Sequence, residues 1–415
     1  MIIFANEIQK TTHMLLYFIT SLPMMVSLFW LTVLIVDCMK QFTMSRVRIA
    51  IFAAVTTTLY GCHFCYFNHQ TEWLPVSDTI YSAATLAVFP LYYLYIKETC
   101  QGSPTMREKL LSVLPSTAIG TAVTIIYILM NANERQTFIN NGLYGGEVLS
   151  LTRLPQLQAI IHAAGRLLFV MEILPVLYFG ARLIRKYNTL VDNVYADSDY
   201  RRMDVADTAM KVFIATCVVG FVCNIIGRYQ FASNIALLAV PSVMFSILIF
   251  LVMYAAHTQR NTIVELKNET SAHTCTKVSE TNTKLPPTQD DTQTEREEVK
   301  PDAINTLRQR IEQMMHEEHP YLKPDLKISD IAMRLGTNRD YIYQAINVQM
   351  GISFADYVNC LRIDHACSLL RKNPTMPLSE VMVACGYSSN STFYRCFRKF
   401  AGKTPAEYIL ANKNS

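Results

Sequence analysis

Long apolar stretches recur through the first 256 residues, and they constrain the fold more than any other feature of this 415-residue chain. A helix of about 20 mostly apolar residues is long enough to cross a bilayer. Four stretches reach that length without an Asp, Glu, Lys or Arg, at residues 15–36, 49–67, 110–130 and 235–256. The N-terminal part of the chain is therefore predicted to be a bundle of membrane-spanning helices.

Three further stretches are interpreted as spans, although each departs from this pattern. The departures are an acidic residue near one end, a short length, and three ionisable side chains inside one span. Residues 76–96 contain Asp78 near one end, and residues 212–227 are short. Residues 157–179 contain His162, Arg166 and Glu172. An interfacial or buried helix is the alternative for the last stretch. We expect seven spans across residues 1–256, and no cleaved signal peptide before the first.

The positive charges between the spans predict an orientation, because cytoplasmic loops retain an excess of Lys and Arg. The richer loops are 37–48, 97–109 and 180–211, with 3, 3 and 6 such residues. The N-terminus and loops 68–75, 131–156 and 228–234 hold 1, 0, 2 and 1. The N-terminus is therefore predicted to lie outside and the C-terminal tail in the cytoplasm.

The composition changes abruptly after His257. Residues 257–301 are polar and contain Pro286, Pro287 and Pro301, which predicts a flexible linker. A flexible coil of this length has an r.m.s. span on the order of 35–40 Å. The linker would let the tail stand clear of the bilayer.

Helical periodicity returns near Asn305, and turn signals divide the tail into roughly seven helices. One two-helix pattern occurs twice: Ile331-Ala332 with Leu335-Gly336 matches Val381-Met382 with Cys385-Gly386. In each copy a glycine is expected in the turn, and Asn338 or Ser389 is expected to cap the second helix. A longer helix, from about Ser353 to Arg371, separates the copies.

The tail from about residue 305 to 410 resembles the DNA-binding domain of the AraC family of bacterial transcription regulators. The residues that carry the resemblance are Gly351-Ile352-Ser353-Phe354 with Tyr357, Arg362-Ile363, Gly386-Tyr387-Ser388-Ser389-Asn390-Ser391, and Gly402 with Thr404-Pro405. The resemblance implies an all-α tail, residues 302–415, with two helix-turn-helix units bridged by a long helix. Tyr343, Gln344 and Ile409 depart from the usual pattern. The resemblance does not extend to the membrane half.

Exposed residues of the two second helices are the candidates for contacting DNA, since a recognition helix presents such side chains to the major groove. Gln344 suits adenine and Arg339 suits guanine. The predicted DNA-binding residues are Asn338, Arg339, Asp340, Tyr343, Gln344 and Asn347 in the first unit, and Ser389, Asn390, Arg395, Arg398 and Lys399 in the second.

The second unit is also the more basic part of the tail. Residues 371–415 hold 7 Lys and Arg against 2 acidic residues, so this half is expected to supply more of the phosphate attraction. Two units in one chain would reach successive major grooves about 34 Å apart. A homodimer is therefore not required for this geometry, although a homodimer would suit two neighbouring copies of the DNA site.

Ionisable side chains inside a span usually face a bundle interior or a watery cavity. His162 and Arg166 are one turn apart, whereas Glu172 lies about 120° around the helix from Arg166. We expect these three residues to line a pocket for a small ligand or a proton. A structural charge network without a ligand is the alternative, and a membrane protein partner is another way for a signal to arrive.

The combination predicts a transcription regulator anchored in the bacterial cytoplasmic membrane, which binds double-stranded DNA in response to a membrane or envelope signal. The alternative is a receptor or transporter-like protein whose tail binds a protein partner. No enzyme motif is recognised, and no cofactor is expected. Cys62, His63 and Cys65 are interpreted as packing residues rather than metal ligands, and His316-Glu317-Glu318-His319 lacks the spacing of a zinc protease.

Overall fold

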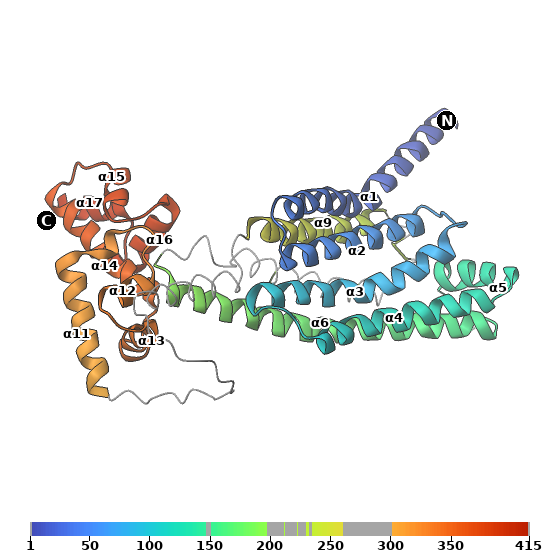
Figure 1. Ribbon diagram of the computed structural model, residues 1–415. Coiled ribbons are helices and arrows are strands. Elements are labelled where there is room, and N and C mark those ends of the chain that lie inside the picture. Colours follow the sequence, from blue (N-terminus) through green and yellow to red (C-terminus); the bar gives the residue numbers. More distant parts are fainter. Residues whose placement is uncertain are drawn as a thin grey trace, which may run out of the picture. The chain divides into compact units, whose positions relative to one another are not determined.

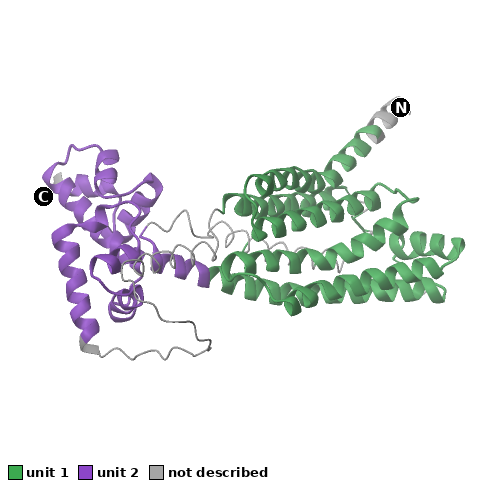
Figure 2. Ribbon diagram, viewed as in Figure 1, with its two compact units in different colours: residues 1–185, 203–264 green, residues 186–202, 265–415 purple. Residues whose placement is uncertain are grey.

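The chain forms two compact helical units in the computed structural model (Figure 2). Unit 1 comprises residues 1–185 and 203–264, and unit 2 comprises residues 186–202 and 265–415. The structure describes residues 2–146, 151–196, 235–259 and 301–413, together with residues 211, 222, 230 and 231. These residues form helices and one isolated β bridge but no strand, which confirms the predicted all-α class.

Unit 1 is built mainly from long helices. They are α1 Ile2–Lys40, α2 Met44–Phe67, α3 Leu74–Cys100, α4 Met106–Leu129, α6 Arg153–Val194 and α9 Ile235–Thr258. Helix α2 packs against α1 and α3, α4 packs against α3, and α9 packs against α1 (Figure 1). A short helix α5, Ala132–Thr137, runs into a π-helical turn η1, Phe138–Tyr144, and lies at one end of the unit (Figure 1).

Six of these helices are long and apolar enough to cross a membrane. They contain six of the predicted spans; of the remaining one, 212–227, only residue 222 is among the described residues. Between 28% and 44% of the apolar window of each helix is buried inside the protein. Most of the apolar surface therefore faces outward, as it would toward lipid and not toward water.

Helix α6 is longer than its predicted span. It covers 42 residues and continues past residue 179 to Val194, through Arg182, Arg185 and Lys186. Charged residues end an apolar stretch, but Arg and Lys are good helix formers and do not end a helix. Residues 186–194 at the end of α6 belong to unit 2.

Unit 2 is made of helices (Figure 1), which pack around two hydrophobic cores. Its elements are α11 Pro301–Glu318, the 3₁₀ turn η2 Pro320–Leu322, α12 Ile328–Arg334, α13 Arg339–Tyr343, the π-helical turn η3 Gln344–Gln349, α14 Phe354–Lys372, α15 Leu378–Ala384, α16 Asn390–Ala401 and α17 Pro405–Lys413. Phe354 and Val358 of α14 belong to the first core, and Ile363 and Leu370 to the second. Helix α14 is therefore the predicted bridge between two helix-turn-helix units.

Candidate DNA-binding interface and helical cavity

Glycine allows the sharp turn in both helix-turn-helix units. Gly336, between α12 and α13, has φ +64°, and Gly386, between α15 and α16, has φ +78°. Glycine adopts this left-handed conformation without the steric penalty of a Cβ atom. The surroundings differ: a Cβ at Gly336 would meet no atom within 4 Å, whereas a Cβ at Gly386 would lie 2.4 Å from the carbonyl oxygen of Leu322.

The first recognition helix begins at the predicted cap. The side chain of Asn338 accepts a hydrogen bond of 3.3 Å from the backbone N–H of Asp340. Asn338, Arg339, Asp340 and Tyr343 are exposed, and Gln344 is half-buried. Arg339 lies 3.6 Å from the Asp340 carboxylate. A DNA base or phosphate that binds Arg339 would therefore compete with the Asp340 carboxylate for the guanidinium.

The second half of this helix is a π turn, and it changes the direction of Asn347. A π turn closes i→i+5 hydrogen bonds and holds more residues than an α turn, so it shifts the side chains that follow. Asn347 is half-buried, and its side-chain amide donates a 2.5 Å hydrogen bond to Oδ1 of Asn193. Asn347 was predicted to face outward; it is instead engaged within unit 2.

The second recognition helix, α16, presents a basic face. Phe393 and Phe397 are buried in the core below it, while Asn390, Arg395, Arg398 and Lys399 are exposed and Ser389 is half-buried. The prediction that the Ser389 hydroxyl caps this helix is wrong. That hydroxyl lies 2.8 Å from the hydroxyl of Ser391, and it accepts no hydrogen bond from a backbone N–H of α16.

Lys399, next to Arg398 in α16, forms an ion pair with an acidic residue of α14. Its ammonium donates a 2.6 Å hydrogen bond to the carboxylate of Asp356 in α14. Both side chains are exposed, so the pair contributes little stability, and a phosphate oxygen can replace the carboxylate. Two predicted contact residues, Arg339 and Lys399, thus sit beside acidic groups.

The end of α6 packs into the first helix-turn-helix unit, a contact that the sequence did not indicate. We call residues 193–196 the α6 terminal segment. The backbone N–H of Ala196 donates to the carbonyl of Leu326, and Asn359 of α14 donates to the carbonyl of Ala196, at 3.0 and 3.2 Å. Ala196 is 1% exposed and belongs to the first core. The segment is therefore part of the folded domain.

Arg362, in the middle of α14, joins the two helix-turn-helix units. It is 1% exposed, and its guanidinium donates to the backbone carbonyls of Tyr321, Lys323 and Pro324 at 2.6, 2.7 and 3.2 Å. The guanidinium also lies over the ring of Tyr387, 5.2 Å from its centroid. A basic residue in the apolar face of a helix was the only sign of this role in the sequence.

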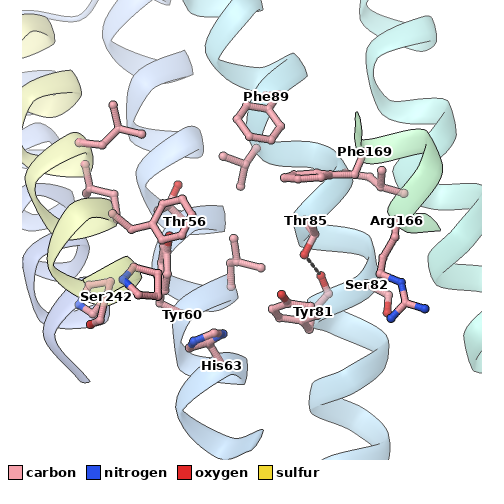
Figure 3. Close-up of a pocket in the computed structure, with 18 of the residues that line it drawn as sticks. Thr56, Tyr60, His63, Tyr81, Ser82, Thr85, Phe89, Arg166, Phe169 and Ser242 are labelled. Carbon is pink, nitrogen blue, oxygen red and sulfur yellow. Dashed lines mark hydrogen bonds between the residues drawn. The ribbon is translucent and has the colours of Figure 1, made fainter. Parts of the chain in front are cut away.

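Unit 1 encloses a cavity of about 250 Å³ between its helices (Figure 3). His162 and Arg166 of α6 line it, together with residues of α1, α2, α3, α4 and α9. Glu172 does not line the cavity. Two of the three residues that were predicted to share a pocket, His162 and Arg166, therefore line this cavity. Glu172 lies elsewhere, as expected from its different position around helix α6.

His162 also belongs to a network between three helices. Its Nε2 lies 2.7 Å from Oδ2 of Asp78, and the same oxygen accepts a 2.9 Å hydrogen bond from Tyr127 of α4. Asp78 is 4% exposed. A buried carboxylate needs such partners, and this pairing ties α3, α4 and α6 together.

Among the described residues, Cys62, His63 and Cys65 do not form a group that could hold a metal ion, and neither do others.

The C-terminal segment matches known DNA-binding proteins. A helix-turn-helix domain family matches residues 311–410. The Msm operon regulatory protein of Streptococcus mutans is 26% identical over 97 residues, which cover 23% of this chain and 34% of that protein. The HTH-type transcriptional regulator YtdP of Bacillus subtilis, itself described as uncharacterized, is 32% identical over 23% of this chain and 12% of its own length.

The probable transcriptional regulator LumQ of Photobacterium leiognathi is 32% identical over 88 residues, 21% of this chain and 35% of that protein. The match thus spans about a third or less of these relatives. No solved structure matches the chain. Residues 311–410 are an AraC-type helix-turn-helix domain, as the motifs predicted, and this domain is the DNA-binding part of transcriptional regulators.

Proposed function

We propose that this protein is a membrane-anchored, sequence-specific transcription regulator that is not an enzyme. One observation carries the proposal: two recognition helices with exposed Arg and polar side chains stand on a domain joined in one chain to six apolar helices. Arg395 and Arg398 suit phosphates or guanine, and Gln344 suits adenine. Asn338, Tyr343, Ser389 and Asn390 remain the other candidate contacts.

The domain must meet DNA in the cytoplasm, so α9 would end at that side of the membrane. The opposite end of unit 1 then faces outward. An apolar cluster at the end of the bundle contains Ile19 of α1, Phe67 of α2, Leu74 of α3 and Leu238 near the start of α9. Helix α1 therefore starts toward the outer side and reaches Lys40 at the inner side, which supports an external N-terminus.

The α6 terminal segment is the proposed route from the membrane to the DNA reader. Helix α6 carries His162 and Arg166 of the cavity, and its terminal segment holds Asn347 of the first recognition helix. A ligand that favours one position of α6 changes the free energy of that contact. DNA affinity would respond without any release of the domain by proteolysis.

Binding to genomic DNA tests the proposal. The full chain in lipid nanodiscs is mixed with sheared genomic DNA of its source organism, and the retained fragments are sequenced and titrated against scrambled competitors. Arg398→Ala should weaken binding to all sequences and reduce the salt slope by about 1. Gln344→Ala should cost about 1–3 kcal/mol and relax the preference at one adenine.

A matched control is available on α11. Arg308 is exposed like Arg398 but is paired with Glu312 at 2.9 Å and belongs to neither recognition helix, so Arg308→Ala should leave DNA binding unchanged. Retention of no fragment above competitor would contradict DNA recognition. A protein that co-purifies through unit 2 instead would favour the alternative of a tail that binds a protein partner.

A further inference from the structure

Aromatic rings form a large part of the wall of the unit 1 cavity. Phe89 of α3 and Phe169 of α6 lie against one another, with ring centroids 5.0 Å apart. Phe52, Tyr81 and Phe245 also line the cavity. Such side chains attract another flat ring by offset or edge-to-face contacts. The wall therefore favours a flat ring over a flexible chain.

The volume limits the size of the ligand. The cavity measures about 250 Å³. An apolar cavity of about 150 Å³ takes up benzene, and pockets for drug-sized ligands measure about 300–1,000 Å³. The available space suits one six-membered ring with a short substituent.

The wall offers no counter-charge to an ionised ligand. The described lining residues include no Asp, Glu or Lys. The Arg166 guanidinium lies away from the two phenylalanine rings (Figure 3), and it already has an interaction within the protein. Both ring nitrogens of His162 are engaged, at 2.8 Å from the Gln158 carbonyl and 2.7 Å from the Asp78 carboxylate. Because an ion without a partner is costly to bury, the cavity favours an uncharged ligand.

Three hydroxyl groups of the lining have already donated their protons. Each forms a hydrogen bond to a backbone carbonyl, and they belong to Thr56, Thr85 and Ser242, with bonds of 2.7, 2.7 and 2.5 Å. A hydroxyl has one proton to donate and two lone pairs that accept. While these bonds are kept, the three groups act as acceptors only. A ligand that bonds to one of them must supply the N–H or O–H itself.

Thr85 is the acceptor that lies closest along the chain to the paired rings. It precedes Phe89 by four residues, so the two side chains share one face of α3 about 6 Å apart along the helix axis. Figure 3 shows the Thr85 hydroxyl between Phe169 and Tyr81 in this view, with a dashed line for its bond to the Tyr81 carbonyl. A ring packed against Phe89 would hold a short substituent near Thr85.

We propose that this cavity binds a small uncharged aromatic molecule with one hydroxyl or N–H group, its ring against Phe89 and Phe169 and its donor on Oγ1 of Thr85. The binding site follows from the geometry of unit 1. Its meaning as the signal for transcription rests on the proposed function. The ligand would contact α3 and α6 together, and so stabilise one arrangement of α6.

Calorimetric titration of the full chain in lipid nanodiscs tests the proposal, with empty nanodiscs as the blank. Phenol carries the ring and the donor, and it is uncharged at neutral pH. Benzoate carries a charge, and cyclohexanol carries the donor on a puckered ring. Phenol should bind at least tenfold more tightly than benzoate, whose charge finds no partner in the wall. It should also bind severalfold more tightly than cyclohexanol, which lacks the aromatic contacts.

Variants locate the site, with anisole as a ring that lacks a donor. Thr85→Val should weaken phenol binding about fivefold, because one neutral hydrogen bond is lost, and leave anisole binding unchanged. Thr79→Val is the matched control. Thr79 is a half-buried threonine of α3 with a 2.9 Å bond to the carbonyl four residues earlier, but it is not among the described lining residues. This control should change neither probe, whereas Phe169→Leu should weaken both.

Several results would overturn the assignment. They are no binding of phenol, benzoate binding as tight as that of phenol, and cyclohexanol binding as tight as that of phenol. A Thr85→Val variant without a selective loss of phenol affinity, or an equal loss in Thr79→Val, would do the same. Should Thr85→Val fail to fold, the comparison of phenol, benzoate and cyclohexanol in the unaltered protein still decides.

DNA binding of the same preparations separates this inference from the proposed function. Phenol binding by a protein that retains no DNA would leave the cavity assigned and refute the regulator. DNA retention without phenol binding would refute the cavity assignment alone. If both are present, saturating phenol should change the affinity for the retained DNA, and an unchanged affinity would refute the role of this ligand as the signal.

Discussion

Replacing the two turn glycines by alanine should destabilise unit 2 to different extents. Both Gly336 and Gly386 have positive φ, where an alanine costs about 1–2 kcal/mol. The Cβ at position 336 meets open space, so Gly336→Ala should cost only this amount. The Cβ at position 386 would lie 2.4 Å from the carbonyl oxygen and 2.8 Å from the carbonyl carbon of Leu322.

The contact at Leu322 cannot be relieved easily. Arg362 holds the carbonyls of Tyr321 and Lys323, on either side of Leu322. Overpacking of this kind costs about 1–3 kcal/mol. The sum for Gly386→Ala is roughly 2–5 kcal/mol when the backbone term is included.

Pulse proteolysis of the full chain in detergent at increasing urea measures the difference, with a C-terminal epitope tag to follow unit 2. For a slope of about 1–2 kcal/mol per molar urea, Gly386→Ala should lower the midpoint by roughly 1–5 M. Gly336→Ala should lower it by roughly 1 M. Equal midpoints for the two variants, or a lower one for Gly336→Ala, would refute the steric argument.

Three other perturbations probe unit 2. Arg362→Met should cost about 3–5 kcal/mol in the same assay, because the buried carbonyl of Tyr321 and the partly buried carbonyls of Lys323 and Pro324 lose their donor; a loss below about 1 kcal/mol would show that they find other partners. Asn193→Ala should change DNA affinity when it is made in the unaltered protein, but not when it is made in the Asn347→Ala variant. An equal change in both proteins would show that the α6 terminal segment does not act on the recognition helix through Asn347. Burial, aided by the nearby side chains of His319 and Lys372, lowers the pKa of His365 below its ordinary value. The unfolded state therefore takes up a proton first, so stability should fall as the pH drops below about 6.5; His365→Gln should flatten this urea-midpoint profile, and an unchanged slope would rule His365 out as the cause.

The sequence predicted more about the helices than about their partners. The apolar stretches located six helices of membrane-spanning length, and the duplicated pattern located both helix-turn-helix units and the bridge between them. These signals are local, since a helix is read from spacing over a few turns. The exposed basic face of α16 was also predictable, because Phe393 and Phe397 define its buried side.

Asn347 shows where local reasoning ends. Its α-helical spacing predicted an outward side chain, but a π turn and a hydrogen bond to Asn193, 154 residues earlier in the chain, engage it within unit 2. Ser389 similarly occupies the capping position without capping. Each outcome depends on which competing donor or acceptor lies within reach, and that is a property of the packed chain.

The amino-acid sequence by itself determined the class of the protein: apolar runs long enough for lipid, then a repeated helix-turn-helix with glycine at each turn. Tertiary structure alone decided that residues 193–196 belong to the DNA-binding unit, that Arg362 ties its halves together, and that His162 and Arg166 line one cavity while Glu172 does not. Helix formation follows from neighbours along the chain. The partner of a buried polar group is chosen among groups far apart in sequence, since leaving it without one costs about 1–3 kcal/mol.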